Sequence, residues 1–169
     1  FSRPLIKGDT VMVAGDVHHF TSFNNGDSYS DITNDITKEK LFYHQNELYT
    51  LDGESLYTSS DTGNNWELIY TSPDTFSALE VYATGNLLYR IETNDNIASS
   101  TIYIHSSSDG GVTWTLKSIL HSTDFWQPVM IGEGSQLFLY TTEGVLDVYH
   151  SADGGTTWQE ISDAPSSSQ

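Results

Sequence analysis

The chain has 169 residues, of which 23 are acidic and only 6 are lysine or arginine, so its formal net charge is −17. This balance argues against binding to nucleic acid or to an anionic membrane, because both require basic side chains to displace counterions. The absence of cysteine excludes disulfides and thiolate chemistry, and no apolar run is long enough to cross a bilayer. The composition instead suits an acidic surface that meets a basic partner or a cation-rich environment.

Short β-rich segments recur along the chain and predict four similar units. The first contains the segments 4–7, 9–13 and 17–20, and the second contains 41–44, 47–51, 55–59 and 66–71. The third contains 79–83, 87–92, 101–106 and 114–120, and the fourth contains 128–131, 136–141, 145–150 and 158–161. Glycine and Asx turns separate the segments, and no stretch has helical periodicity. We therefore predict an all-β repeat protein with units at 1–35, 36–74, 75–122 and 123–163, and a linker or disordered tail at 164–169.

A turn motif, S-x-D-x-G-x-x-W, follows the third segment of each unit. Full copies begin at residues 59, 107 and 151, and a weaker copy at residue 22 has Asn for Asp and Tyr for Trp. We expect the glycine to adopt a positive φ, the Asp or Asn to accept hydrogen bonds from the turn, and the aromatic ring to be buried. The motif residues are Ser59, Asp61, Gly63, Trp66, Ser107, Asp109, Gly111, Trp114, Ser151, Asp153, Gly155, Trp158, Asn24, Gly26 and Tyr29.

The motif resembles the Asp-box, or BNR repeat, of β-propellers such as those of sialidases, some β-glucan hydrolases and sortilin-like receptors. The units that carry it cover nearly the whole chain. The resemblance implies a β-propeller of four four-stranded antiparallel blades with Asp-box hairpins, either as a small closed ring or as part of a larger one. It also implies a structural role for the motif.

The candidate binding residues lie in loops that we expect on the face opposite the motif. They are Asp124, Phe125 and Trp126 in the loop 121–127, Asp95 and Asn96 in the loop 92–100, and Asp74 in the loop 71–76. Aromatic rings beside carboxyl and amide groups suit sugar stacking or a protein interface. Trp126 equally suits packing between blades.

Catalysis and metal binding have weaker support. Arg3 and Arg90 are the only arginines, so the arginine cluster of a sialidase cannot form, whereas other glycan hydrolases need only two carboxylates. We expect no cofactor, because each motif offers one carboxylate where Ca²⁺ takes six to eight oxygens. A Ca²⁺ site at the motif or at 31–35 is the alternative. His18 and His19 are adjacent on a predicted strand and point to opposite faces, so they cannot chelate one ion together.

The sequence therefore predicts a non-enzymatic propeller module that binds a protein or glycan partner through its loop face. We expect it in a larger secreted, cell-surface or virion-associated assembly, with a homo-oligomer or other neighbours completing the ring if four blades do not close alone. One alternative is a glycoside hydrolase of an Asp-box family, or a fragment of one. Another is a purely structural assembly subunit. Facing carboxylates in a cleft flanked by aromatic rings would favour the hydrolase.

Overall fold

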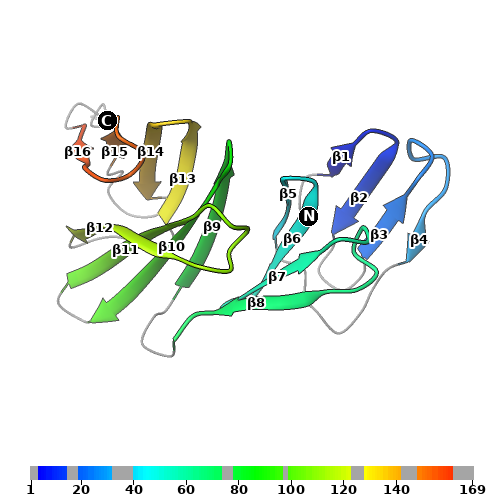
Figure 1. Cartoon of the computed structure of the whole chain (residues 1–169), viewed down its shortest axis with the longest axis horizontal. Coiled ribbons are helices and arrows are strands. Elements are labelled where there is room, and N and C mark those ends of the chain that lie inside the picture. Colours follow the sequence, from blue (N-terminus) through cyan, green and yellow to red (C-terminus); the bar gives the residue numbers. More distant parts are fainter. Residues whose placement is uncertain are drawn as a thin grey trace, which may run out of the picture. The chain divides into compact units, whose positions relative to one another are not determined.

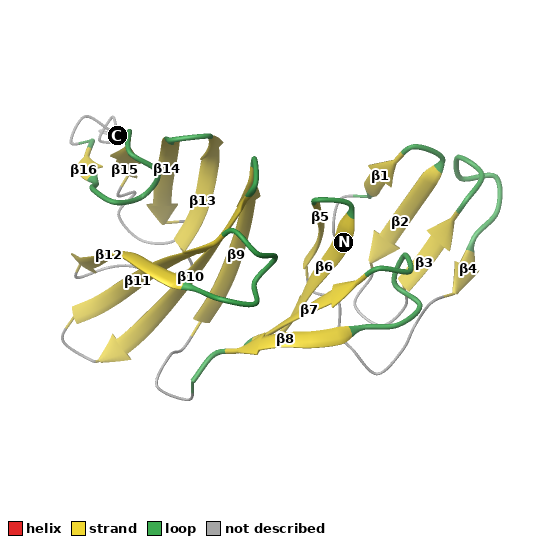
Figure 2. Cartoon of the chain, viewed as in Figure 1, coloured by secondary structure: helices red, strands yellow, loops and turns green. Residues whose placement is uncertain are grey.

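The computed structural model describes residues 4–14, 19–31, 40–73, 78–96, 99–122, 128–141 and 148–161. These residues form strands and turns without any helix (Figure 2), and so none of them belongs to a helix that could cross a membrane. The strands are β1 (Leu5–Lys7), β2 (Thr10–Ala14), β3 (His19–Ser22), β4 (Ser30–Asp31), β5 (Lys40–His44), β6 (Glu47–Asp52), β7 (Ser55–Ser59), β8 (Glu67–Thr71), β9 (Ala78–Thr84), β10 (Leu87–Asn96), β11 (Ser99–Ser107), β12 (Thr115–Ser122), β13 (Pro128–Glu133), β14 (Gln136–Thr141), β15 (Val148–Ser151) and β16 (Gln159–Glu160).

Consecutive strands pair in antiparallel fashion and form four four-stranded sheets (Figure 1). The sheets are β1–β4, β5–β8, β9–β12 and β13–β16. The chain divides into two compact units, residues 1–71 with the first two sheets and residues 72–169 with the last two. The prediction of an all-β fold built from four four-stranded antiparallel sheets is thus confirmed.

In the first unit, polar and aromatic side chains join the two sheets. The Tyr43 hydroxyl, on β5, donates to the Met12 sulfur on β2 over 3.7 Å. The Lys7 ammonium, on β1, lies 4.4 Å from the centroid of the Tyr43 ring and donates to the Asn46 carbonyl at 3.3 Å. These contacts combine cation–π attraction with hydrogen bonds at the junction between the sheets.

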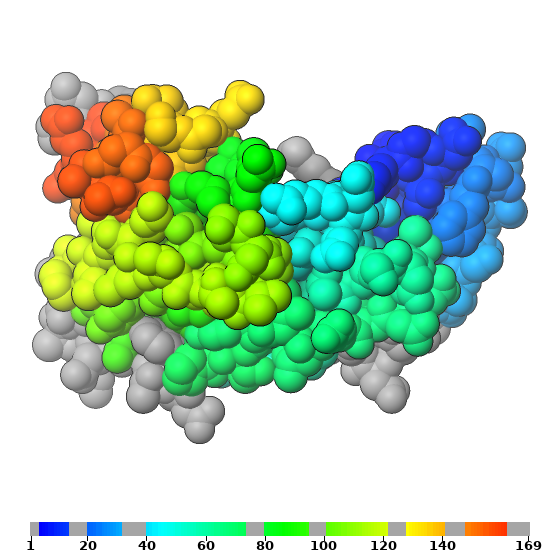
Figure 3. Space-filling view, in the orientation of Figure 1, coloured from blue at the N-terminus to red at the C-terminus, as the bar shows by residue number. Residues whose placement is uncertain are grey.

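In the second unit, the two sheets bury a shared apolar core. Its members are at most 2% exposed, and the space-filling view shows the two sheets in direct contact (Figure 3). They are Tyr89, Ile91, Ile102 and Ile104 from β9–β12, with Met130, Leu137 and Leu139 from β13–β16. Because side chains alternate along a strand, the other face of β10 carries Leu88, Arg90 and Glu92 instead.

Most strands begin and end within one to three residues of the predicted segments, but the predicted loop 92–100 is largely strand. β10 continues to Asn96 and β11 begins at Ser99, with Glu92 opposite Tyr103. β-Branched residues such as Thr93 favour the extended backbone and lengthen this ladder despite the polar composition. In the first unit, the short fourth strand β4 was not predicted.

Candidate functional site

Each full turn motif forms the same set of hydrogen bonds. In the β7–β8 turn, the Ser59 hydroxyl donates to Asp61 Oδ1 at 2.9 Å and accepts from the Gly63 amide at 2.9 Å. The same Asp61 oxygen accepts from the Asn65 amide at 2.9 Å. In the β11–β12 and β15–β16 turns the distance from the serine hydroxyl to the aspartate is 2.7–2.9 Å, and that from the glycine amide to the serine is 2.8 Å. The distance from the threonine amide to the aspartate is 2.8–2.9 Å. The Asp therefore caps its own turn, as predicted.

The weaker copy closes the β3–β4 turn with similar hydrogen bonds, except that one side-chain bond runs in the opposite direction. Asn24 Oδ1 accepts from the Ser22 hydroxyl at 2.8 Å and from the Ser28 amide at 3.0 Å. Its Nδ2 donates to the Ser28 hydroxyl at 2.9 Å, where an Asp would accept. The Tyr29 ring is 48% exposed, so the prediction that this ring is buried is wrong. Its hydroxyl lies over the turn at Gly26, away from the core.

Two features of these turns were not predicted. The motif serine is nearly fully buried, at 1–3% exposure, and its hydroxyl satisfies the buried glycine amide. The motif glycine has the expected positive φ of 83–94°, but the residue before it has a positive φ as well. That residue is Thr62 in the β7–β8 turn, with a φ of 60°. A β-branched residue rarely adopts this conformation, so the hydrogen bonds of the turn must hold it there.

The hydrogen bonds also stabilise the ionised form of the motif carboxylates. The hydroxyl and amide of Thr113 lower the pKa of Asp109 to about 2. The amide and hydroxyl of Thr157 lower the pKa of Asp153 to about 2, and the amide of Asn65 lowers that of Asp61. A carboxylate that accepts several N–H and O–H donors holds its proton less tightly.

We expect the turns to weaken in acid. Because the pKa of Asp109 is lower in the folded chain than its usual 3.8, its contribution is complete above that value and is lost as the pH falls through about 2. Urea unfolding followed by tryptophan fluorescence between pH 2 and 7 should show this decline. Asp109→Asn should make the decline smaller by the share of Asp109 without unfolding the chain, since Asn24 occupies the same place in the first turn. Identical pH profiles for the variant and the wild type would contradict this prediction.

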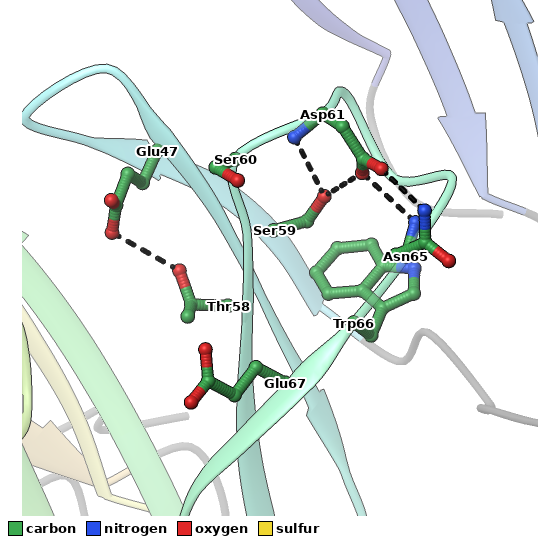
Figure 4. A pocket seen from close by; sticks show the side chains of 8 residues that line it. All are labelled: Glu47, Thr58, Ser59, Ser60, Asp61, Asn65, Trp66 and Glu67. Atoms are coloured by element: carbon green, nitrogen blue, oxygen red, sulfur yellow. Dashed lines mark hydrogen bonds between the residues drawn. The ribbon is translucent and has the colours of Figure 1, made fainter.

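A pocket of about 230 Å³ opens beside the β7–β8 turn (Figure 4). It is lined by Glu47, Thr58, Ser59, Ser60, Asp61, Asn65, Trp66 and Glu67. The sheet register puts Tyr49 opposite Thr58 and Thr58 opposite Glu67. Directly opposite residues share a face, and so do residues two apart on one strand. The register thus brings Glu47 and Glu67 to one face of the sheet, although 20 residues separate them in the sequence.

Hydroxyl groups orient one of the two pocket glutamates. Glu47 Oε2 accepts from the Tyr49 and Thr58 hydroxyls, each at 3.3 Å. The carboxylates of Glu47 and Glu67 lie on the same side of β7 with Thr58 between them, and Trp66 immediately precedes Glu67 (Figure 4). Glu67 lies two strands away from Glu47 and two residues further along the sheet, so the Cα atoms of the two glutamates are about 12 Å apart. The pocket thus combines two carboxylates, hydroxyl groups and an indole.

A second cluster of charged side chains is largely buried on β9–β12. Glu92 Oε2 lies 3.1 Å from Arg90 Nε and 3.8 Å from His105 Nδ1, and Glu92 Oε1 accepts from the Ser72 hydroxyl at 2.6 Å. The Arg90 guanidinium lies 4.9 Å from the centroid of the Trp114 ring. Burial lowers the pKa of His105, as does the Arg90 charge, while Glu92 acts in the opposite direction. This network joins β10, β11 and Ser72 inside the second unit.

The predicted binding residues are not brought together by the described part of the chain. Asp74, Asp124, Phe125 and Trp126 lie outside the described residues, as does His18. Asp95 and Asn96 belong to β10 instead of a loop. Among the described residues no three His, Asp or Glu side chains are grouped closely enough to hold a metal ion. The predicted loop face is therefore untested, and the pocket is a site that the sequence did not suggest.

Comparison with known proteins gives matches in structure only. No family model and no curated protein matches the chain. A GH43 β-1,3-galactosidase aligns with 94% of this chain and 44% of its own, at 12% identity and a TM-score of 0.56. The fold is a β-propeller. A mutant α-L-arabinofuranosidase from Fusarium graminearum in complex with an iminosugar inhibitor aligns with 67% of this chain and 42% of its own, at 18% identity and a TM-score of 0.48. YCF48 bound to a D1 peptide aligns with 95% of this chain and 66% of its own, at 14% identity and a TM-score of 0.41.

The propeller chain spans less than half the length of the galactosidase that it resembles. This likeness corrects two predictions, the non-enzymatic interaction module and the absence of catalysis, and favours the glycoside hydrolase alternative. The sequence does not show whether two carboxylates face each other across a cleft, so it could not favour hydrolysis by two carboxylates over a binding role. Hydrolysis by two carboxylates needs no basic residue.

Proposed function

We propose that this propeller is part of a glycoside hydrolase in which Glu47 and Glu67 are the catalytic carboxylates. The observation that carries the proposal is the pocket of about 230 Å³, which both glutamates line from one face of the sheet and which Trp66 lines from the other side of β7. Pockets that bind sugars combine an aromatic surface with a few oriented polar groups. The fold that the chain shares with a β-1,3-galactosidase adds support, although a fold alone does not define an activity.

The arrangement suits hydrolysis with inversion. In that reaction one carboxylic acid protonates the oxygen of the leaving group, and a carboxylate on the other side of the sugar ring activates a water molecule. Glu47 is suited to the second role, because the Tyr49 and Thr58 hydroxyls fix its orientation. Glu67 then supplies the proton. With Cα atoms about 12 Å apart, the sugar and the water would lie over Thr58, between the two carboxylates.

The test is hydrolysis of a panel of oligosaccharides by the whole chain, beginning with β-1,3-linked galactosides. We expect release of reducing ends, and NMR of the first product should show an inverted anomeric centre. Glu47→Gln and Glu67→Gln should each lower the rate about 100-fold or more, because each removes one proton-transfer group. Glu54→Gln is the matched control, since Glu54 is an exposed glutamate in the turn at the other end of the same sheet. Full activity in either pocket variant, or no hydrolysis of any oligosaccharide, would refute the proposal.

We also propose that the repeated turns are Asp-boxes and that the chain belongs with the propellers that carry them. In support, the serine, aspartate and glycine of all three full copies make the same hydrogen bonds. Their role is to fix the turn before the fourth strand of each sheet. In the second sheet this turn leads directly into Trp66 and Glu67, so it positions two residues of the pocket.

A further inference from the structure

The pocket presents negative charge without any basic side chain. Glu47, Asp61 and Glu67 are acidic, and the remaining lining residues are hydroxyl-bearing, amide or aromatic. Such a lining repels a sugar that carries a carboxylate and attracts one that carries a positive charge. The charge of the whole chain, −17, acts in the same direction at longer range.

The three carboxylates differ in their capacity to bind a ligand. Asp61 already accepts from the Ser59 hydroxyl and the Asn65 amide on Oδ1, and from Asn65 Nδ2 at 2.6 Å on Oδ2. It therefore contributes mainly its charge, which its lowered pKa preserves to more acidic pH than that of an ordinary aspartate. Glu47 has only two long hydrogen bonds of 3.3 Å from hydroxyls. An ammonium group can form shorter, charge-assisted hydrogen bonds with such a carboxylate.

The size and the aromatic wall of the pocket fit a single charged sugar. At about 230 Å³ it is smaller than the roughly 300–1,000 Å³ typical of sites for drug-sized molecules, which suits one monosaccharide unit of a longer glycan. An indole attracts a cation that lies near its face. Trp66 lines the same pocket from the other side of β7, so it adds to the attraction for a cation within the pocket without facing Glu67 (Figure 4).

From these observations we infer that the pocket recognises an amino sugar with a free ammonium group, as in a deacetylated hexosamine glycan. The inference rests on the proposed function, since it assigns the substrate class of the same pocket. N-acetylation would remove the positive charge, and a uronic acid would bring an unfavourable negative one. The attraction between charges should also weaken with salt, because ions screen it.

Isothermal titration of the whole chain with three tetrasaccharides tests this inference. The probes are β-1,4-linked glucosamine, its N-acetylated counterpart and galacturonate, each at 20 and 300 mM salt. We expect the amino sugar to bind about 10-fold more tightly than the N-acetylated probe at low salt, with a smaller ratio at high salt, and the galacturonate not to bind. Asp61→Asn and Glu47→Gln should each reduce the ratio, whereas Glu160→Gln, at an exposed glutamate on β16, should leave it unchanged.

The outcomes separate this inference from the proposed hydrolase. Equal binding of the amino and N-acetylated probes, or no binding of either, overturns the charge preference whether or not glycans are cleaved. A preference that Asp61→Asn and Glu47→Gln do not alter also overturns it, since the attraction would then come from the surface as a whole. Preferential binding that depends on these residues supports the inference. If no glycan is cleaved in that case, the hydrolase alone is refuted.

Discussion

Replacement of Glu92 by alanine is expected to lower the free energy of unfolding by about 3–5 kcal/mol. Glu92 is fully buried, and its carboxylate pairs with Arg90 Nε at 3.1 Å and accepts from the Ser72 hydroxyl at 2.6 Å. Without it, Arg90, only 7% exposed, keeps its charge but loses the ion pair with Glu92. Removing one member of a buried pair leaves a charge without compensation, which costs more than the pair contributes when it is intact.

Urea unfolding followed by tryptophan fluorescence would measure this loss. Glu133→Ala is the control, because Glu133 is an exposed glutamate at the end of β13 and its loss should change stability by less than about 0.5 kcal/mol. In a Glu92→Ala variant that still folds, the pKa of His105 should fall further, since Glu92 is the group that raises it. A histidine NMR titration would detect that change. Equal stability of Glu92→Ala and Glu133→Ala would contradict the prediction.

The sequence was sufficient to predict the repeating part of the fold. Recurring short β-rich segments between glycine and Asx turns located most strands, because such turns end each strand at a regular spacing. The motif residues Asp61 and Gly63 had predictable roles, since an Asx side chain and a positive φ act within one turn. The role of Ser59 was not predicted, because its hydroxyl is needed only once the turn buries the Gly63 amide. Local chemistry was predictable, and the effect of burial on it was not.

The pocket could not be predicted, because it depends on pairing between strands. Glu47 and Glu67 meet only in the register that puts Tyr49 opposite Thr58 and Thr58 opposite Glu67. A shift of one residue would turn Glu67 to the other face. The ladder between β7 and β8 also has an irregularity after Leu56, which no alternation pattern reveals. The signal available in the sequence was modest: Glu67 directly follows a motif tryptophan, and Glu47 begins a strand.

Gly132 is the position where a single methyl group should be most disruptive. Its φ is 144°, and a Cβ there would lie 2.1 Å from the Gln136 carbonyl oxygen and 2.9 Å from Leu137 Cα. Both are backbone atoms of β14, the strand that pairs with β13. The glycine backbone cannot easily move away, because its amide donates to the Tyr82 hydroxyl at 3.0 Å and its carbonyl accepts from that hydroxyl at 2.5 Å. These bonds join the two sheets of the second unit.

We therefore expect Gly132→Ala to destabilise the chain by about 3 kcal/mol or more, from overpacking together with backbone strain. The matched control is Gly134→Ala, only two residues away. Gly134 also has a positive φ, of 60°, but a Cβ there would meet nothing within 4 Å, so only the conformational cost of about 1–2 kcal/mol applies. Comparison of the two variants by urea unfolding separates the steric clash from the strain. If they are equally stable, the β13–β14 ladder has absorbed the methyl group, and the Tyr82 hydrogen bonds do not hold Gly132 in place.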